Sequence, residues 1–66
     1  MRHFDYESIA KEAGIPEQKL DELRKTIRLE FPRDEMMYEL HLLRVCMAVK
    51  EGHITVLDAL RSEEAA

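Results

Sequence analysis

Histidine and cysteine are the side chains of this sequence that could do acid–base, nucleophilic or metal chemistry near neutral pH. They are His3, His41, His53 and Cys46. His41 and Cys46 lie five residues apart in one predicted helix, about 140° around its axis, so they cannot chelate one ion together. Cys46 stands in an apolar run, which raises the pKa of a thiol and makes it a poor nucleophile. We therefore expect no catalytic residue and no metal ligand among these four.

The carboxylates do not form a predicted active site either. Glu35 and Glu39 share one helical face, but two ligands without a loop of further oxygens make a poor calcium or magnesium site. No carboxylate is placed in an apolar stretch where burial would raise its pKa for general-acid work. Gly14 and Gly52 are the only glycines, so a glycine-rich phosphate loop is excluded. We expect no enzyme activity and no cofactor.

The first half of the chain has the apolar spacing of two amphipathic helices, predicted over residues 5–13 and 16–30. Asp5 can cap the first helix, and Gly14 can end it with a positive φ angle. Pro16 suits the first turn of the second helix, and Pro32 ends that helix near residue 30.

The second half predicts a long helix over residues 35–51 and a short one over 55–62, followed by a loose tail at 63–66. Asp34 can cap the long helix and Gly52 can end it. Thr55 and Asp58 have the spacing of a capping box. Period-two alternation is absent, so the prediction is one all-α domain over residues 1–66, a small four-helix domain with a helix-turn-helix-like N-terminal half.

The predicted core follows from the same apolar spacing. It consists of Ile9, Ala10, Ala13, Ile15, Leu20, Leu23, Ile27, Phe31, Leu40, Leu43, Met47, Leu57 and Leu60.

The stretch "SIAKEAGIPEQKLDEL" has the spacing of a helix-turn-helix. Ala10 is the small residue at a helix crossing, Gly14 the turn glycine, and Leu20 and Leu23 the inward apolar residues. "IAKEAGI" followed by "LDELRK" resembles the start of a MerR-type regulator, and "YELHLLRVCMAVKEGHITVLDAL" resembles the helix, glycine turn and short helix that follow there. The chain is also similar to MerR-like modulators of DnaJ-type co-chaperones, which use this scaffold to bind protein.

This resemblance implies a DNA-binding or protein-binding role, and two departures favour protein. Only "FPRDEM" stands where MerR-type proteins carry a basic and aromatic wing. The residues that would enter a DNA groove include three acids, which face phosphate charge. The partner or DNA face is predicted to consist of Glu17, Gln18, Asp21, Glu22, Lys25 and Arg28.

Basic residues on and beside this face allow the alternative hypothesis of a DNA-binding transcriptional regulator that reads DNA with the second helix. They are Lys19, Arg24, Lys25 and Arg28. They can instead pair with acids three or four residues away, as Asp21 can with Arg24 or Lys25 and Glu22 with Lys25. We favour a small regulatory or adaptor protein that acts by binding another protein.

Net charge and composition indicate the environment in which the protein is expected to work. Fourteen acidic residues against ten basic ones give a formal net charge of −4, which repels a polyanion at long range. A single cysteine fits a reducing compartment, and no segment approaches the roughly 20 apolar residues of a membrane span. We expect a cytoplasmic protein that does not enter membranes.

The long helix has two apolar stripes on opposite sides, each at i, i+4, i+7 and i+11 spacing. One contains Met36, Leu40, Leu43 and Met47, and the other contains Tyr38, Leu42, Val45 and Val49. One chain of this length can cover one stripe, so the other predicts a partner, most simply a second copy. The alternative is a monomer in which the long helix is the central helix of a compact four-helix domain. We assign Tyr38, Leu42, Val45 and Val49 to the homodimer interface, although either stripe could face inward.

Overall fold

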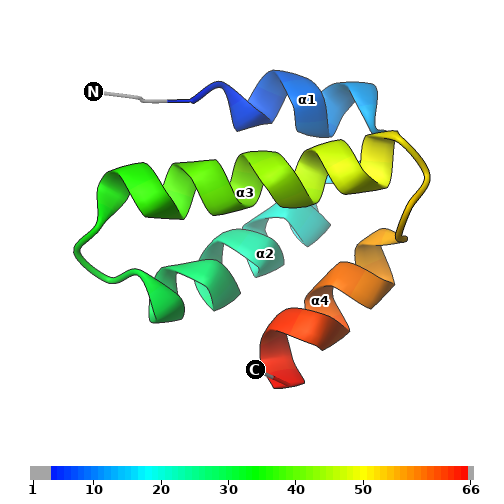
Figure 1. Ribbon diagram of the computed structural model, residues 1–66. Helices are drawn as coiled ribbons and strands as arrows, with labels where there is room; N and C mark the ends of the chain where they lie inside the picture. Colours follow the sequence, from blue (N-terminus) through cyan, green and yellow to red (C-terminus); the bar gives the residue numbers. More distant parts are fainter. Residues whose placement is uncertain (1–3, 66) are drawn as a thin grey trace.

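The computed structural model describes residues 4–65, and for residues 62–65 the backbone alone. This part of the chain folds into four helices without a strand, as Figure 1 shows, which confirms the all-α fold. The helices are α1 (Tyr6–Glu12), α2 (Glu17–Glu30), α3 (Glu35–Lys50) and α4 (Val56–Ala65). Within the described residues, none of these helices combines the length and the apolar character needed to cross a membrane.

Local hydrogen bonds fix the beginnings of three helices where the sequence predicts them. The Asp5 carboxylate accepts a bond from the Ser8 amide at 3.3 Å, and Asp34 accepts one from the Met37 amide at 3.1 Å. Before α4, the Thr55 hydroxyl accepts from the Asp58 amide at 3.1 Å, while the Asp58 carboxylate accepts from the Thr55 amide at 3.4 Å. These side chains replace partners that the first turn of a helix lacks.

Two glycines end α1 and α3 in the left-handed conformation. Gly14 has a φ of 75°, and the next amide, of Ile15, reaches back to the Ala10 carbonyl at 3.0 Å. The same bonding pattern closes α3 at Gly52, which has a φ of 81°. A side chain at either position would strain the backbone, so both turns depend on glycine.

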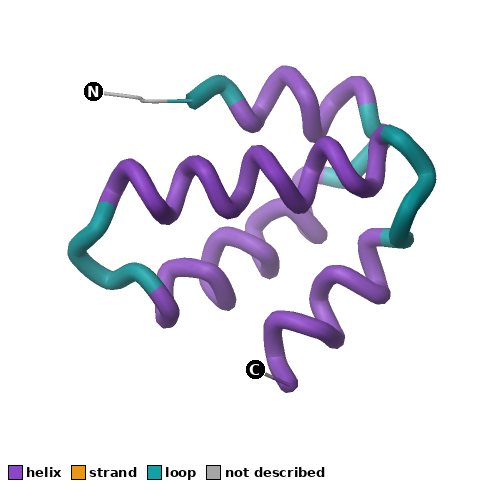
Figure 2. The backbone as a smooth tube through the Cα atoms, viewed as in Figure 1, coloured by secondary structure: helices purple, strands orange, loops and turns teal. Residues whose placement is uncertain are grey.

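The long helix α3 is the centre of the domain. It packs against α1, α2 and α4, with α1 running beside it in the same direction and α2 in the opposite direction (Figures 1 and 2). The Phe4 amide donates to Glu39 at 2.9 Å at one end of the α1–α3 pair, and Lys50 contacts Glu12 at 2.6 Å at the other. α4 packs mainly on α2.

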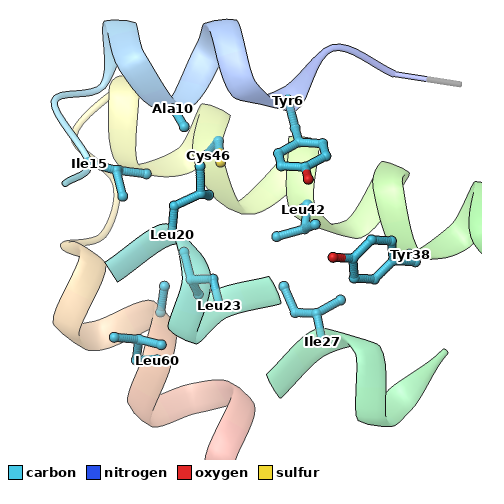
Figure 3. Packing of buried hydrophobic residues seen from close by; sticks show 11 residues of the cluster. Tyr6, Ala10, Ile15, Leu20, Leu23, Ile27, Tyr38, Leu42, Cys46 and Leu60 are labelled. Atoms are coloured by element: carbon cyan, nitrogen blue, oxygen red, sulfur yellow. The ribbon is translucent and has the colours of Figure 1, made fainter. Parts of the chain in front are cut away.

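The core lies on the inward side of α3, where Tyr38, Leu42 and Cys46 are buried. Figure 3 shows the cluster, with Ala10 close to Cys46 and the hydroxyl of Tyr6 pointing toward its middle. The remaining buried apolar residues are Ile15, Leu20, Leu23, Ile27, Ala59 and Leu60.

The core prediction is right for most of the first half of the chain and wrong in part for the second. Met47 is 42% exposed and Leu57 is 58% exposed, so neither is a core residue. Leu40 and Leu43 are half-buried, as are Ile9, Ala13 and Phe31 in the first half. The buried apolar residues missing from the predicted core are Tyr6, Tyr38, Leu42, Cys46 and Ala59.

The predicted dimer interface is also wrong, because that stripe of α3 faces the core. Tyr38 is 7% exposed and Leu42 is fully buried, while Val45 and Val49 are half-buried and pack against the core. Tyr38 and Leu42, two of the four side chains of the predicted interface, are therefore not accessible to a second chain.

α4 is longer than the sequence predicts. α4 continues to Ala65, so the helix includes residues 63–65 of the predicted loose tail, and residue 66 lies outside the described residues.

α1 packs chiefly on α3, whereas its links to α2 are made by side chains. The helix-turn-helix arrangement of α1 and α2 therefore stays a prediction.

We expect Leu23→Ala to lower the free energy of unfolding by about 2–5 kcal/mol, because it removes a fully buried side chain and leaves a cavity. Leu29→Ala is the matched control, since Leu29 is 83% exposed and should change stability by less than about 0.5 kcal/mol. Urea unfolding followed by circular dichroism measures both. Equal stability of Leu23→Ala and the parent would show that the core assignment of α2 is wrong.

Candidate interaction face

The solvent side of α2 holds most of the predicted partner or DNA face. Glu17, Gln18, Asp21, Glu22 and Lys25 are exposed, and Arg28 is half-buried at the border of the core. Their spacing places Gln18, Glu22 and Lys25 in one row. We call the exposed residues 17, 18, 21, 22, 25 and 29 the α2 face.

Arg24, beside this face, is a clamp between α1 and α2. Its guanidinium donates to the Tyr6 hydroxyl at 2.9 Å and to Glu7 at 2.8 Å, both on α1. Within α2 it bonds to Glu17 at 3.0 Å and to Asp21 at 2.8 Å. The guanidinium carbon also lies 5.5 Å from the centre of the Tyr6 ring. The guanidinium of Arg24 therefore forms ion pairs with three carboxylates.

The electrostatic surroundings hold Arg24 in its charged form. Partial burial lowers its pKa, but hydrogen bonds with Tyr6, Glu17 and Asp21 outweigh this and raise the pKa above its usual value. Its side chain is only 20% exposed. A guanidinium with these partners is not available to a phosphate, because every bond to the phosphate would cost an existing charged bond.

Arg28 is engaged in a similar way at the other end of α2. It pairs with Glu35 at 3.0 Å and lies over the Tyr38 ring, 3.6 Å from its centre. Burial raises the pKa of Tyr38, and this effect outweighs the opposing influence of Arg28, so the phenol stays neutral. Arg28 thus links the α2–α3 corner rather than pointing freely outward.

The lysines complete the charge pattern of the α2 face. Lys19 pairs with Glu22 at 3.1 Å, which replaces the predicted pairing of Glu22 with Lys25. Asp21 pairs with Arg24, the first of its two predicted partners. Among the described residues, Lys25 makes no ion pair. One free cation beside Glu17, Asp21 and Glu22 leaves the surface acidic.

Leu29 adds an apolar side chain to this acidic surface. It is 83% exposed and lies four residues after Lys25 and seven after Glu22, hence on the same side of the helix. Leu29 is not among the residues of the predicted partner or DNA face. Its position outside the Leu20, Leu23 and Ile27 stripe was the available signal.

A hollow of about 620 Å³ adjoins the α2 face where α1 meets the start of α2. Its apolar lining consists of Ala10, Ile15 and Leu20. The polar lining consists of Asp5, Glu7, Ser8, Lys11 and Glu17. The three acids already have structural partners, because Asp5 caps α1 and the two glutamates hold Arg24.

The residues considered for chemistry are dispersed. Cys46 is fully buried, and burial raises the pKa of its thiol to about 11. His41 is half-buried with its ring 5.7 Å from that of Phe31, and His53 is 72% exposed near Glu51. His3 lies outside the described residues. His41 and Cys46 lie five residues apart on different sides of α3, so the helix does not bring this imidazole to the thiol.

The burial and the hydrogen bonding of Glu39 on α3 differ from the prediction. Glu39 is 5% exposed, which corrects the expectation that no carboxylate is buried, and it bonds to the Phe4 amide rather than sharing a site with Glu35. Among the described side chains, no group of three or more His, Cys, Asp or Glu residues is gathered as a metal site would require.

We expect Arg24→Met to lower the free energy of unfolding by about 1–3 kcal/mol, because three carboxylates lose their shared cation while the apolar stem is kept. Added salt should reduce the loss by screening the remaining repulsion. Lys25→Met is the control and should be nearly neutral. Urea unfolding at low and high salt checks this, and equal behaviour of the two variants would contradict the clamp.

The Cys46 thiol should react very slowly with a disulfide reagent in the folded protein, since it is buried and protonated at neutral pH. In denaturing urea the same thiol should react at the rate of a free cysteine. Absorbance of the released thiolate at pH 8 measures both rates. Rapid reaction without urea would place Cys46 at the surface.

Comparison with known proteins adds no further constraint on this face. No known protein family, curated protein or solved structure gives a significant match to the chain. The MerR-like resemblance therefore stays a hypothesis that rests on the quoted residues.

Proposed function

We propose that this chain is a small regulatory or adaptor protein that binds another protein through the α2 face and works as a homodimer. The observation that carries the proposal is the engagement of the arginines. Arg24 and Arg28 are held by carboxylates and by tyrosine rings of the same chain. The α2 face is left with acids and an exposed leucine, a combination suited to a protein surface. For the compartment we propose the cytoplasm, on the ground of the single cysteine.

DNA binding is less well supported as an alternative. A DNA-binding helix needs several cations for phosphate and usually an Arg or Asn pair for the bases. On the α2 face Lys25 is the one cation without an ion pair among the described residues, and Glu17, Asp21 and Glu22 would approach phosphate.

We expect no binding of the protein to a labelled mixed-sequence DNA duplex at low salt, because the face that would approach the duplex is acidic. Fluorescence anisotropy at about 100 µM protein reaches the range of ordinary non-specific binding. Saturable binding that weakens as salt rises would favour the DNA alternative.

A protein partner should be lost when the leucine of the α2 face is changed. In pull-downs with tagged protein, Leu29→Asp should release a partner that the parent retains, because the carboxylate would be buried in the contact. Leu57→Asp is the matched control, since Leu57 is 58% exposed on α4 and outside the face. Loss with both variants, or with neither, would contradict the assignment of the face.

A further inference from the structure

The outward side of α3 carries the second apolar stripe of this helix. Met36 is 51% exposed and Met47 is 42% exposed, and Leu40 and Leu43 between them are half-buried. Leu43 lies at the edge of this side, where part of its side chain packs against the core. We call these four residues the α3 stripe. In Figures 1 and 2, α2 lies behind α3 and no described helix passes in front of it. Another helix can therefore approach along this side.

The spacing of the α3 stripe is that of a short coiled-coil seam. Steps of four, three and four residues are the alternating a and d positions of a heptad repeat. From Met36 to Met47 the seam is about 16 Å long at 1.5 Å per residue. Such a seam is completed by a second helix whose side chains fit between these four.

The order of side chains in the stripe points to a second copy as that helix. Read in either direction, the stripe is Met, Leu, Leu, Met with the same four–three–four spacing. In an antiparallel pair related by a two-fold axis, Met36 lies opposite Met47 of the second copy, and Leu40 lies opposite its Leu43. Every contact then occurs twice, as an isologous interface requires.

The charges at the ends of the stripe fit the same arrangement. With the axis between residues 41 and 42, residues 33–35 of one copy lie level with residues 48–50 of the other. Exposed Arg33 is then level with Lys50 of the second copy and one residue from its exposed Glu51. Because Lys50 is already paired with Glu12 of its own chain at 2.6 Å, Glu51 is the nearby charge that can pair with Arg33 at each end. The antiparallel pair also sets the positive end of each helix dipole beside the negative end of the other.

The acidic charge of the chain does not oppose this contact. Glu7, Glu12, Glu17, Asp21 and Glu22 lie on α1 and α2, whereas Arg44 is the only charged residue on the outward side between Met36 and Met47. Two copies can thus meet through α3 without bringing their acidic surfaces together.

We propose that the protein dimerises by antiparallel packing of the α3 stripes of two copies. This deepens the homodimer part of the proposed function and is independent of the partner bound by the α2 face. Because the seam is only about 16 Å long, we expect a weak dimer that dissociates on dilution.

Sedimentation equilibrium over a range of concentrations tests the proposal. The parent should move from a mass of 7.8 kDa toward twice that value as its concentration rises. Met36→Lys and Met47→Glu should each weaken the dimer at least tenfold by placing a charge against an apolar side chain. The double variant should recover the affinity, because each lysine then faces a glutamate of the second copy.

The same series of variants includes a control and a test of the antiparallel register. Leu57→Glu, on α4, should dimerise like the parent, and circular dichroism should show unchanged helicity in every variant. A parent that stays at one chain mass at about 1 mM overturns the dimer. A dimer unaffected by the single changes overturns the assignment to α3, and a double variant that stays weak overturns the antiparallel register. None of these results affects the pull-down with Leu29→Asp, so the partner-binding proposal fails or stands separately.

Discussion

Burial of the inward side of α3 is the interaction on which the other helices depend. Leu42 and Cys46 are completely removed from solvent there, and each fully buried apolar side chain of leucine size contributes about 1.5–3 kcal/mol. α1 has seven residues and is too short to be stable as an isolated helix. It persists because Tyr6 and Ala10 pack on α3, and because contacts with Glu39 and Lys50 hold its two ends.

The charged side chains at the border of this core determine the character of the surface. The guanidinium groups of Arg24 and Arg28 lie over the rings of Tyr6 and Tyr38, which belong to the core. Arg24 also binds three carboxylates that would otherwise repel one another, and Arg28 binds the carboxylate of Glu35. Positive charge is thus used for internal packing, and the α2 face keeps an acidic surplus.

The two apolar sides of α3 connect the fold with the proposed function. The inward side is covered by this chain, and the outward side accepts a second copy in the proposed dimer. Because α2 lies behind α3 in Figure 1, the α2 face of each copy stays accessible in such a pair. A dimer would present two identical acidic faces to a partner, and two linked contacts bind more tightly than one.

Local interactions are what the sequence by itself determined. The helix beginnings at Asp5, Asp34 and Thr55 and the glycine turns at Gly14 and Gly52 depend on residues within a few positions of one another, so their spacing predicts them. The stripe Leu20, Leu23 and Ile27 was also predictable, because the opposite side of α2 is polar and leaves only one way to bury the helix.

The tertiary structure determined features that the spacing of apolar residues does not distinguish. The two stripes of α3 have identical spacing, so the sequence cannot show which one α1, α2 and α4 cover, and the predicted interface fell on the buried one. Arg24 looked like a surface cation because Tyr6 and Glu7 are 18 and 17 residues away in the chain. The burial of Glu39 was not predicted for the same reason, because its partner Phe4 lies 35 residues away in the sequence. Contacts between distant residues exist only after packing, and they determined which side of α3 this chain covers.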